Sequence, residues 1–511
     1  MLRSIKGQFI RNEHLRQAAQ PDIRMTRKGL LFEASGTARG ARTREKNTFQ
    51  STATASVAMC LGLAITYLLL PEGGPVAIYR TAAIGAALAM GLGIFLEARG
   101  VRSLIRVDLL MLVALFGLTL VEFFFPQEEL MDVVTAQSAT HGVEALFIGF
   151  CGLIIGRNFA PRSRAIGASA ALVPWSPTTL FRIYIVLLCL GYLNMLWAVG
   201  FNPVELVNQM LAPRFSQPWA RGALGGWREL PGELSGVLRY LIPAVAGAVL
   251  AKPLSFTLSQ KAITVLGLAF TLFFGFSSGT RYVFCVYLII FVTSYLLLKP
   301  AITWKGVTIM SLMTAGLLYL AAYYMLEFRG VGLEHFVSDG DKGHRRDTLF
   351  IDNNLPVISR LTDVFPERFA YLGSEVVFFS ALHPVPRALW PGKPEGLSIS
   401  TEDALGLRGL TVSSTFVGES YMMGGYSAIL VMGLLFGWLG GWWHRVASDL
   451  RSNVGVMVYA SGCFAAAISM RSMTWTTVAM LTPFALWLYA RSRSPRPQSY
   501  AIQPGSRKPS A

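Results

Sequence analysis

Long apolar runs, separated by short polar segments, dominate the chain between residues 53 and 490. A helix needs roughly 20 apolar residues to cross about 30 Å of hydrocarbon, and the runs have about that length. We therefore predict an all-α polytopic membrane protein with about twelve transmembrane helices. The predicted spans are residues 53–71, 76–96, 104–125, 141–156, 180–200, 234–251, 261–277, 282–298, 305–325, 425–444, 453–470 and 473–490.

Two polar segments, residues 201–233 and 326–424, are too long to be simple turns between spans. The second mixes acidic and basic residues with histidines, prolines and aromatic residues. It is therefore too polar for lipid and too rich in aromatic residues for a plain linker. We expect it to form a large, partly helical loop over the spans. Its pattern predicts an amphipathic helix from Leu361 to about Leu382 and a short helix that starts at Ser400 or Thr401.

These limits divide the chain into five parts. They are a basic N-terminal tail (1–52), the first nine spans with the outer loop 201–233 (53–325), the large loop (326–424), the last three spans (425–490) and a basic C-terminal tail (491–511).

Composition excludes a soluble enzyme. Charged residues make up 14% of the chain and hydrophobic residues 53%, whereas about 25% of an ordinary soluble domain is charged. Most of the net charge of +16 lies in the two tails. Basic tails beside apolar spans are typical of cytoplasmic ends next to anionic lipid, so we expect the lipid bilayer as a partner. No basic domain with interleaved aromatic residues indicates a nucleic-acid partner.

Lysine and arginine in the short loops predict the orientation, because positive residues near span ends stay in the cytoplasm. If the N-terminus lies inside, every inner loop is basic, including those with Arg106 and Arg157. An even number of spans returns the C-terminal tail to the same side. We therefore predict a multi-pass protein with both termini in the cytoplasm and residues 201–233 and 326–424 outside.

Several arginines lie outside in this orientation, against the usual bias. Arg281 lies in the tight turn between spans seven and eight, and Arg471 in the short turn between spans eleven and twelve, and neither turn contains an acid. Guanidinium groups fixed at the membrane surface suit a phosphate or pyrophosphate ligand, because the planar fork donates bidentately and stays charged. The alternative is that each arginine snorkels or pairs with a loop carboxylate.

Three short motifs resemble those of the Wzy-type oligosaccharide repeat unit polymerases, a family that makes bacterial O-antigen and exopolysaccharide. The first is the turn Ser278-Gly279-Thr280-Arg281, which opens a mid-chain span. The second is the proline, tryptophan and lysine segment 386–394, late in the large loop. The third is the stretch 413–425, which leads into the next span with a Gly-Glu pair, a tyrosine and glycines.

The resemblance implies a GT-C-like membrane enzyme of the bacterial inner membrane. Such a glycosyltransferase polymerises undecaprenyl-pyrophosphate-linked repeat units at the periplasmic face, by transferring the growing glycan from its carrier to the next lipid-linked unit. Undecaprenyl-pyrophosphate-linked glycans are then its partners, with a chain-length regulator and a flippase expected alongside.

This transfer needs a base for the acceptor hydroxyl and positive charge for the departing pyrophosphate. We assign the base to Glu419 and the charge to Arg281 and Arg471. A purely structural role for Glu419, as a carboxylate near a helix N-terminus, is the alternative.

Further substrate contacts are expected from the large loop and the entry to the tenth span. The candidates are Arg387, Lys393, Trp390, Tyr421, Arg345, Arg346 and His383. Trp390 and Tyr421 could stack on sugar faces, although aromatic residues at a membrane interface are often belt residues. No Asp-x-Asp pair or His/Asp cluster resembles a metal site, so we expect no metal and no cofactor.

Two other functions compete with polymerisation. An O-antigen ligase shares the expected fold and the lipid pyrophosphate donor, but the segments around Trp390 and Glu419 favour the polymerase. A transporter or flippase for polysaccharide precursors would also have about twelve spans. The long outer loop is unusual for a transporter, and no pair of halves with matched, broken spans is apparent.

Overall fold

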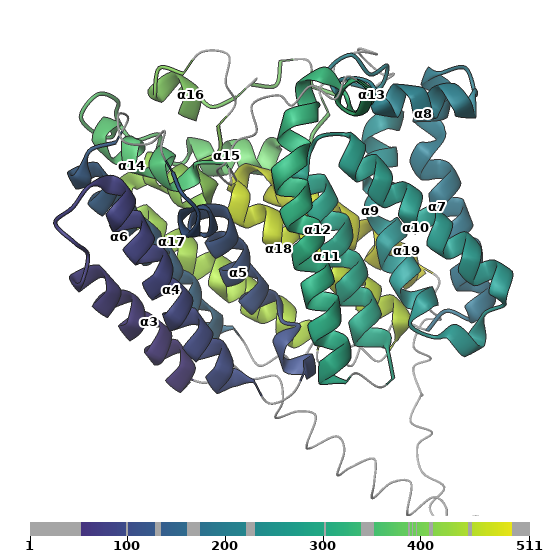
Figure 1. The fold of residues 1–511 in the computed structure, drawn as a ribbon, viewed down its shortest axis with the longest axis horizontal. Coiled ribbons are helices and arrows are strands. Elements are labelled where there is room, and N and C mark those ends of the chain that lie inside the picture. Colours follow the sequence, from purple (N-terminus) through teal and green to yellow (C-terminus); the bar gives the residue numbers. More distant parts are fainter. Residues whose placement is uncertain are drawn as a thin grey trace, which may run out of the picture. The chain divides into compact units, whose positions relative to one another are not determined.

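The computed structural model describes residues 53–98, 101–127, 134–160, 174–220, 230–300, 303–338, 352–386, 389–390, 392–394, 396–407, 412–447 and 452–492. Every regular element in these ranges is a helix (Figure 1). The longer helices are α3 (Ala53–Leu68), α4 (Pro75–Glu97), α5 (Val107–Thr119), α6 (Ala136–Gly156), α7 (Pro177–Ala198), α9 (Leu230–Leu250), α10 (Leu258–Ser277), α11 (Arg281–Leu298), α12 (Trp304–Val331), α17 (Thr415–Ala447), α18 (Asn453–Arg471) and α19 (Thr476–Ser492). Shorter helices are α8 (Pro203–Leu211), α13 (Leu333–Ser338), α14 (Asn354–Val364), α15 (Glu375–Leu382), α16 (Thr401–Ala404) and the 3₁₀ turn η7 (Met473–Trp475).

Each of the twelve predicted spans carries one of the longer helices. Within the described residues, nine helices are long and apolar enough to cross a membrane, namely α4, α6, α7, α9, α10, α11, α12, α17 and α18. α3 and α5 are apolar but shorter. The chain is thus an all-helical, multi-pass membrane protein in its described part.

Helix boundaries differ from the prediction in the large loop. The helix expected from Leu361 to Leu382 is two helices, α14 and α15, because the chain leaves the helical conformation at Phe365. The short helix expected at Ser400 or Thr401 is α16, whose N-cap Ser400 accepts a hydrogen bond from the Asp403 N–H. α17 begins at Thr415 rather than at residue 425, so Glu419 lies inside a helix.

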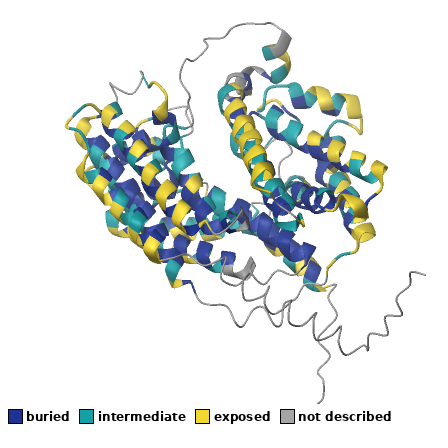
Figure 2. Ribbon diagram, turned by 60° about the horizontal axis from the view of Figure 1, so that its bottom comes forward, coloured by how far each residue is buried: buried dark blue, intermediate teal, exposed yellow. Residues whose placement is uncertain are grey.

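Two helix groups build the core on either side of α18. One core joins α4, α5, α6, α14 and α17, and the other joins α7, α9, α10, α11 and α19. In the most apolar stretch of α18, 83% of the residues are buried, against 6% in α12, so α18 is central and α12 peripheral. Figure 2 shows buried residues between the helices and exposed ones on their outer faces.

Glycines bring α6 and α17 into backbone contact. A Cβ atom at Gly152 would lie 2.9 Å from the Cα of Gly433, and one at Gly437 would lie 2.3 Å from the Leu153 carbonyl oxygen. Small residues allow such approach between membrane helices, where close packing contributes much of the attraction. This contact fixes α17, which carries Glu419.

α17 is broken at Gly424 and Gly425. Gly425 has φ of +65°, which favours glycine, and the ring of Tyr371 leaves little room for a side chain there. Just before the break, the carbonyls of Met422 and Met423 accept hydrogen bonds from the N–H groups of Leu372 and Gly373. The segment before α15 is thereby tied to the first part of α17.

A buried ionic network joins the end of α4, the start of α5 and the end of α6. Glu97 accepts from Arg106 at 2.8 Å and from Arg157 at 2.7 Å, while Asp108 pairs with the same two arginines. The four side chains are 2% exposed or less. The sequence places Arg106 and Arg157 among the basic residues of the inner loops. In the structure both are core residues.

Candidate functional site

Arg281 is the first residue of α11 because of the turn that precedes it. α10 ends at Ser277, and Gly279 takes φ of +62°, a left-handed conformation that reverses the chain at little cost only for glycine. The Arg281 side chain is 17% exposed, and one of its nitrogens lies 2.7 Å from Asp352. The small-residue turn of the first motif thus places the guanidinium at the helix end.

Arg471 is the last residue of α18. Its backbone carbonyl accepts a hydrogen bond from the Ser413 hydroxyl at 3.1 Å, which joins the turn after α18 to the segment before α17. Its guanidinium lies 5.4 Å from the centre of the Tyr282 ring, in a cation–π contact with the residue that follows Arg281. The two arginines therefore lie at the same end of the bundle.

Asp352 bridges the two arginines. Its Oδ1 pairs with Arg281 at 2.7 Å and its Oδ2 with the Nε of Arg471 at 3.3 Å. The two turns contain no acid, but a residue of the large loop supplies a carboxylate to both arginines, as the alternative of pairing with a loop carboxylate had it.

The neighbours of Asp352 hold it in place. Asn353 takes a left-handed φ of +51°, a conformation that asparagine tolerates better than most residues. Asn354 is fully buried and donates to the carbonyl of Leu118 at 2.7 Å, near the end of α5. The start of α14 is thereby anchored to the helix bundle, and Asp352 is directed at the arginines.

Arg471 retains hydrogen-bonding capacity. Its side chain is 29% exposed and contacts Asp352 through Nε, whereas both terminal nitrogens have no hydrogen-bond partner among the described residues. A guanidinium presents five donors in a fixed planar fork. These terminal nitrogens could bind two oxygens of a phosphate.

Glu419 lies next to the two residues that follow Arg471. Its carboxylate accepts hydrogen bonds from the Ser472 hydroxyl and, at 2.6 Å, from the Met473 N–H. Arg471 is close enough to interact with it electrostatically. Asp352 thus joins Arg281 to Arg471, and Glu419 binds the turn that follows Arg471, so the three residues assigned to catalysis lie near one another.

The other candidates divide between the described and the undescribed part of the chain. Lys393 donates to the carbonyls of His383 and Val385 at 2.8 and 2.9 Å, so it stabilises its own loop. His383 packs against the Trp475 ring, and Trp390 is 37% exposed. Arg387, Arg345 and Arg346 lie outside the residues that the structure describes.

Tyr421 is 5% exposed, which limits its use as a stacking platform. Its ring packs edge-on against Tyr371 and Tyr426, with centroids 6.2 and 5.4 Å away. Tyr371 is 39% exposed and is the more accessible ring of this group. Sequence reasoning selected the buried member of the cluster.

Sequence reasoning missed Asp352 and Ser472. The polar run Asp352-Asn353-Asn354 before an apolar helical stretch predicts a turn into a helix. It gives no sign that the first carboxylate contacts residues far along the chain. Ser472 has no sequence signal apart from its position after Arg471. Within the described ranges, no three His, Cys, Asp or Glu side chains gather as a metal site would require.

The described arrangement can hold an anion next to a carboxylate. Arg471 and Arg281 supply positive charge, Asp352 offsets part of it, and the Glu419 carboxylate, bound to the turn after α18, is the candidate proton acceptor. No protein-family model, no curated protein and no solved structure matches the chain.

Proposed function

We propose that the protein is a lipid-pyrophosphate-dependent glycosyltransferase. It would polymerise undecaprenyl-pyrophosphate-linked oligosaccharide repeat units into O-antigen or exopolysaccharide. The observation that carries the proposal is the Arg471 guanidinium, whose two terminal nitrogens remain available beside Arg281 and Glu419. The motif resemblance supports the same function, because Arg281 and Glu419 lie in the resembling segments and the Arg471 carbonyl accepts a hydrogen bond from Ser413, the first residue of the third segment.

The proposed chemistry balances with these groups. The acceptor sugar hydroxyl loses its proton to Glu419 as its oxygen bonds to the anomeric carbon of the donor glycan. The bond between that carbon and the pyrophosphate oxygen breaks, and the electron pair leaves with undecaprenyl pyrophosphate. Arg471 and Arg281 stabilise the charge that develops on the leaving group, which is the kind of fixed electrostatic contribution that lowers barriers most.

This proposal includes a GT-C-like architecture, about twelve spans and a position in the bacterial inner membrane. Both termini would be cytoplasmic, so that the turn after α18 and the large loop face the periplasm. A chain-length regulator and a flippase would work with the protein. The buried state of Arg106 and Arg157 leaves the remaining basic loop residues and the tails to support this orientation.

Purified protein in liposomes, supplied with a lipid-linked repeat unit alone and, in a parallel reaction, together with a lipid A core, tests the function. We expect a ladder of longer glycans without an energy source, and released undecaprenyl pyrophosphate. Transfer only to a lipid A core would instead identify a ligase. Movement of the lipid across the bilayer without extension would identify a flippase. Either of these two results overturns the polymerase proposal.

A further inference from the structure

α7 ends in a tight corner that its local sequence determines. The Gly200 N–H donates to the Trp197 carbonyl at 3.1 Å. The Phe201 N–H donates to the Leu196 carbonyl at 2.7 Å. These two hydrogen bonds form a Schellman motif, which closes a helix at a residue in the left-handed conformation, here Gly200 with φ of +65°. The direction in which the chain leaves α7 is therefore fixed.

The next helix, α8, starts immediately after this corner. Asn202 is its N-cap, and the Asn202 Oδ1 accepts from the N–H groups of Val204 and Glu205 at 3.0 and 3.2 Å. Pro203 takes the first helical position, where its missing N–H leaves no hydrogen bond unmade. Figure 1 shows α8 lying across the end of α7. Residues 199–202 thus turn the chain from a long apolar helix into a short helix at its end.

The corner lies at the surface of the hydrocarbon. α7 has 22 residues and is long and apolar enough to cross a membrane. At 1.5 Å per residue it is about 33 Å long, close to the roughly 30 Å thickness of the hydrocarbon. Because α8 follows without a long connection, it lies at the level where acyl chains meet headgroups.

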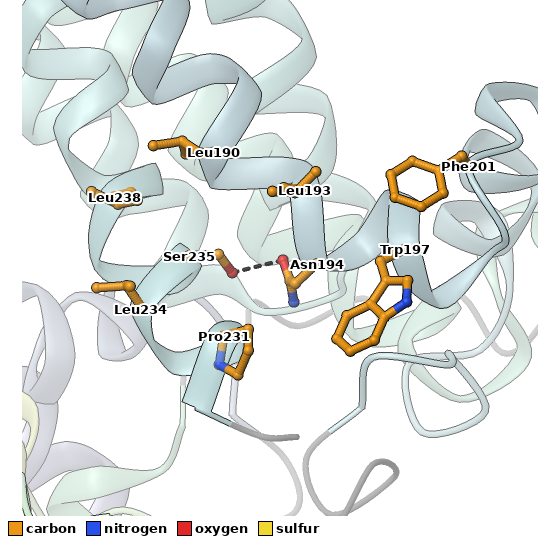
Figure 3. Close-up of a pocket in the computed structure, with 9 residues that line it drawn as sticks. All are labelled: Leu190, Leu193, Asn194, Trp197, Phe201, Pro231, Leu234, Ser235 and Leu238. Carbon is orange, nitrogen blue, oxygen red and sulfur yellow. Dashed lines mark hydrogen bonds between the residues drawn. The ribbon is translucent and has the colours of Figure 1, made fainter. Parts of the chain in front are cut away.

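An exposed apolar stripe runs along α7 and continues past the corner. Leu190, Leu193 and Trp197 are between 44% and 51% exposed, and Phe201 is 61% exposed. All four line one groove between α7 and α9, so they share a side of the chain (Figure 3). On a spanning helix such a stripe faces acyl chains, and Phe201 extends it beyond the helix end.

α8 is anchored by one face and exposes another. Leu206 and Met210, one turn apart, are 5% and 0% exposed and pack in the core that α7, α9 and α10 share. Val204 and Val207 are 68% and 38% exposed. The two valines form an apolar flank next to the buried face, on the helix that follows the stripe of α7.

The opposite flank of α8 is polar. At about 100° per residue, Glu205 and Gln209 fall roughly opposite the valine flank. Gln209 donates to the Glu205 carboxylate at 2.7 Å, so these two side chains partner each other along the helix. A helix with one apolar and one polar flank is typical of segments that lie in the plane of a membrane interface.

Phe201 is costly if water surrounds it. Its φ of +61° is a left-handed conformation that strains a bulky residue and that glycine would adopt freely. Its ring is also mostly exposed, which wastes apolar surface in water. Lipid around the ring removes the second cost and gives a reason for an aromatic residue at a position that favours glycine.

We propose that α8 is an interfacial helix whose Phe201, Val204 and Val207 side chains insert into the leaflet that the end of α7 reaches. The bilayer is the occupant, because the flank continues the stripe of a spanning helix. α8 also anchors the start of the large loop, since a Cβ at Gly332, directly after α12, would lie 2.8 Å from the Leu211 carbonyl oxygen. The inference does not depend on the proposed glycosyltransferase function.

Photocrosslinking from α8 tests the inference. A benzophenone amino acid replaces Val204, Val207 or Gln209 in turn, and the purified full chain is reconstituted into vesicles of phosphatidylethanolamine and phosphatidylglycerol. Mass spectrometry then identifies the crosslinked species. We expect phospholipid adducts at both valine positions, at least tenfold more abundant than at Gln209, the matched control on the opposite flank.

Two other results would overturn the inference. Crosslinks between two copies of the chain at the valine positions would identify a self-association surface instead. Equal lipid adducts at all three positions, or none at any of them, would show that the valine flank is not selectively in lipid.

Hydroxyl-radical footprinting of the unsubstituted chain, in nanodiscs of the same lipids, needs no variant. Phe201 should be oxidised at least tenfold more slowly than Tyr371 of the large loop, although its ring is the more exposed of the two on the protein surface, at 61% against 39%. Similar rates would place Phe201 in water and overturn the inference. No glycan enters these experiments, so their failure would leave the proposed function standing.

Discussion

Arg471 contacts Asp352 through its Nε, at 3.3 Å, and both of its terminal nitrogens remain without a partner among the described residues. The contact through Nε fixes the plane of the guanidinium. It leaves the two terminal nitrogens, which can bind two oxygens of one anion, unused. Arg281 contacts the other oxygen of the same carboxylate. One aspartate therefore orients two cations from separate helices.

Lysine should not replace arginine at this position. Arg471→Lys keeps the charge but loses the fork, so we expect kcat/KM for chain extension to fall at least tenfold, or about 1.4 kcal/mol. The measurement is the initial rate of repeat addition by purified protein. Arg80→Lys is the control, since Arg80 is an exposed arginine near the start of α4, and it should extend chains normally. Equal rates for both variants and the wild type would exclude a bidentate role.

Asp352 competes with any anion for the two arginines. Asp352→Asn should therefore bind undecaprenyl pyrophosphate more tightly, by about fivefold, because a partly exposed charge contributes roughly 1 kcal/mol. Isothermal titration of the detergent-solubilised full chain measures this affinity. Weaker binding by a folded Asp352→Asn protein would mean that positioning of the arginines outweighs competition.

Glu419 has either a chemical or a structural role, and two variants distinguish them. Glu419→Gln keeps an acceptor oxygen near the turn between α18 and η7 but cannot take a proton, so extension should fall by at least a hundredfold, as expected for loss of a general base. Ser472→Ala removes one donor to the carboxylate and should reduce the rate only a few fold. The extension rate and the thermal unfolding temperature are measured for each.

If Glu419 serves only to hold the turn, the pattern changes. Both variants would then lower the unfolding temperature and retain extension at permissive temperature. That result would move the proposed base to another residue.

The buried ionic network should contribute to stability and not to chemistry. Arg157→Met leaves Glu97 and Asp108 with one fewer cation in a region that is almost fully buried, which should destabilise the protein by about 3–5 kcal/mol. Adding Glu97→Gln should cost less than the sum of the two single changes. Chemical unfolding of the solubilised protein measures both. A fully additive double variant would show that the two side chains are not coupled.

The close packing of α6 against α17 can be tested at a glycine. A Cβ at Gly437 would lie 2.3 Å from the Leu153 carbonyl oxygen, so Gly437→Ala should destabilise the protein by about 1–3 kcal/mol through overpacking. Gly91→Ala is the matched control, because nothing lies within 4 Å of its Cβ position. It should be neutral or slightly stabilising, as alanine favours helix. Equal stability of the two variants would contradict the close packing.

The helical architecture was predictable from the apolar runs, since length and composition alone decide which segments can cross a membrane. The boundaries of the helices were harder to predict from the sequence. The first turn of α17, from Thr415, packs against α14, where a Cβ at Gly418 would lie 3.1 Å from Leu361, and this contact is not local in sequence. The split between α14 and α15 has a local signal, because Phe365 precedes Pro366 and the residue before a proline disfavours the helical conformation. The position of the segment before α15 is tertiary, since the Leu372 and Gly373 N–H groups are bound to α17.

The candidate site was predictable only in part. Arg281 and Arg471 stood out because arginine in a short turn on the predicted outer side opposes the usual charge bias. Asp352 did not stand out, because no local sequence pattern distinguishes it from the other acidic residues of the large loop. Periodicity also could not show that Tyr421 is buried while Tyr371 is exposed, since that depends on the break at Gly424 and Gly425.

Release of undecaprenyl pyrophosphate during glycan transfer tests the central claim most directly. The measurement counts carrier released per glycosidic bond formed by purified protein, in the wild type and in Arg471→Lys. We expect one equivalent per bond in both, with the rate in Arg471→Lys lower by at least tenfold. Bond formation at the wild-type rate in Arg471→Lys, or glycan transfer without release of the carrier, would contradict the assignment of this site.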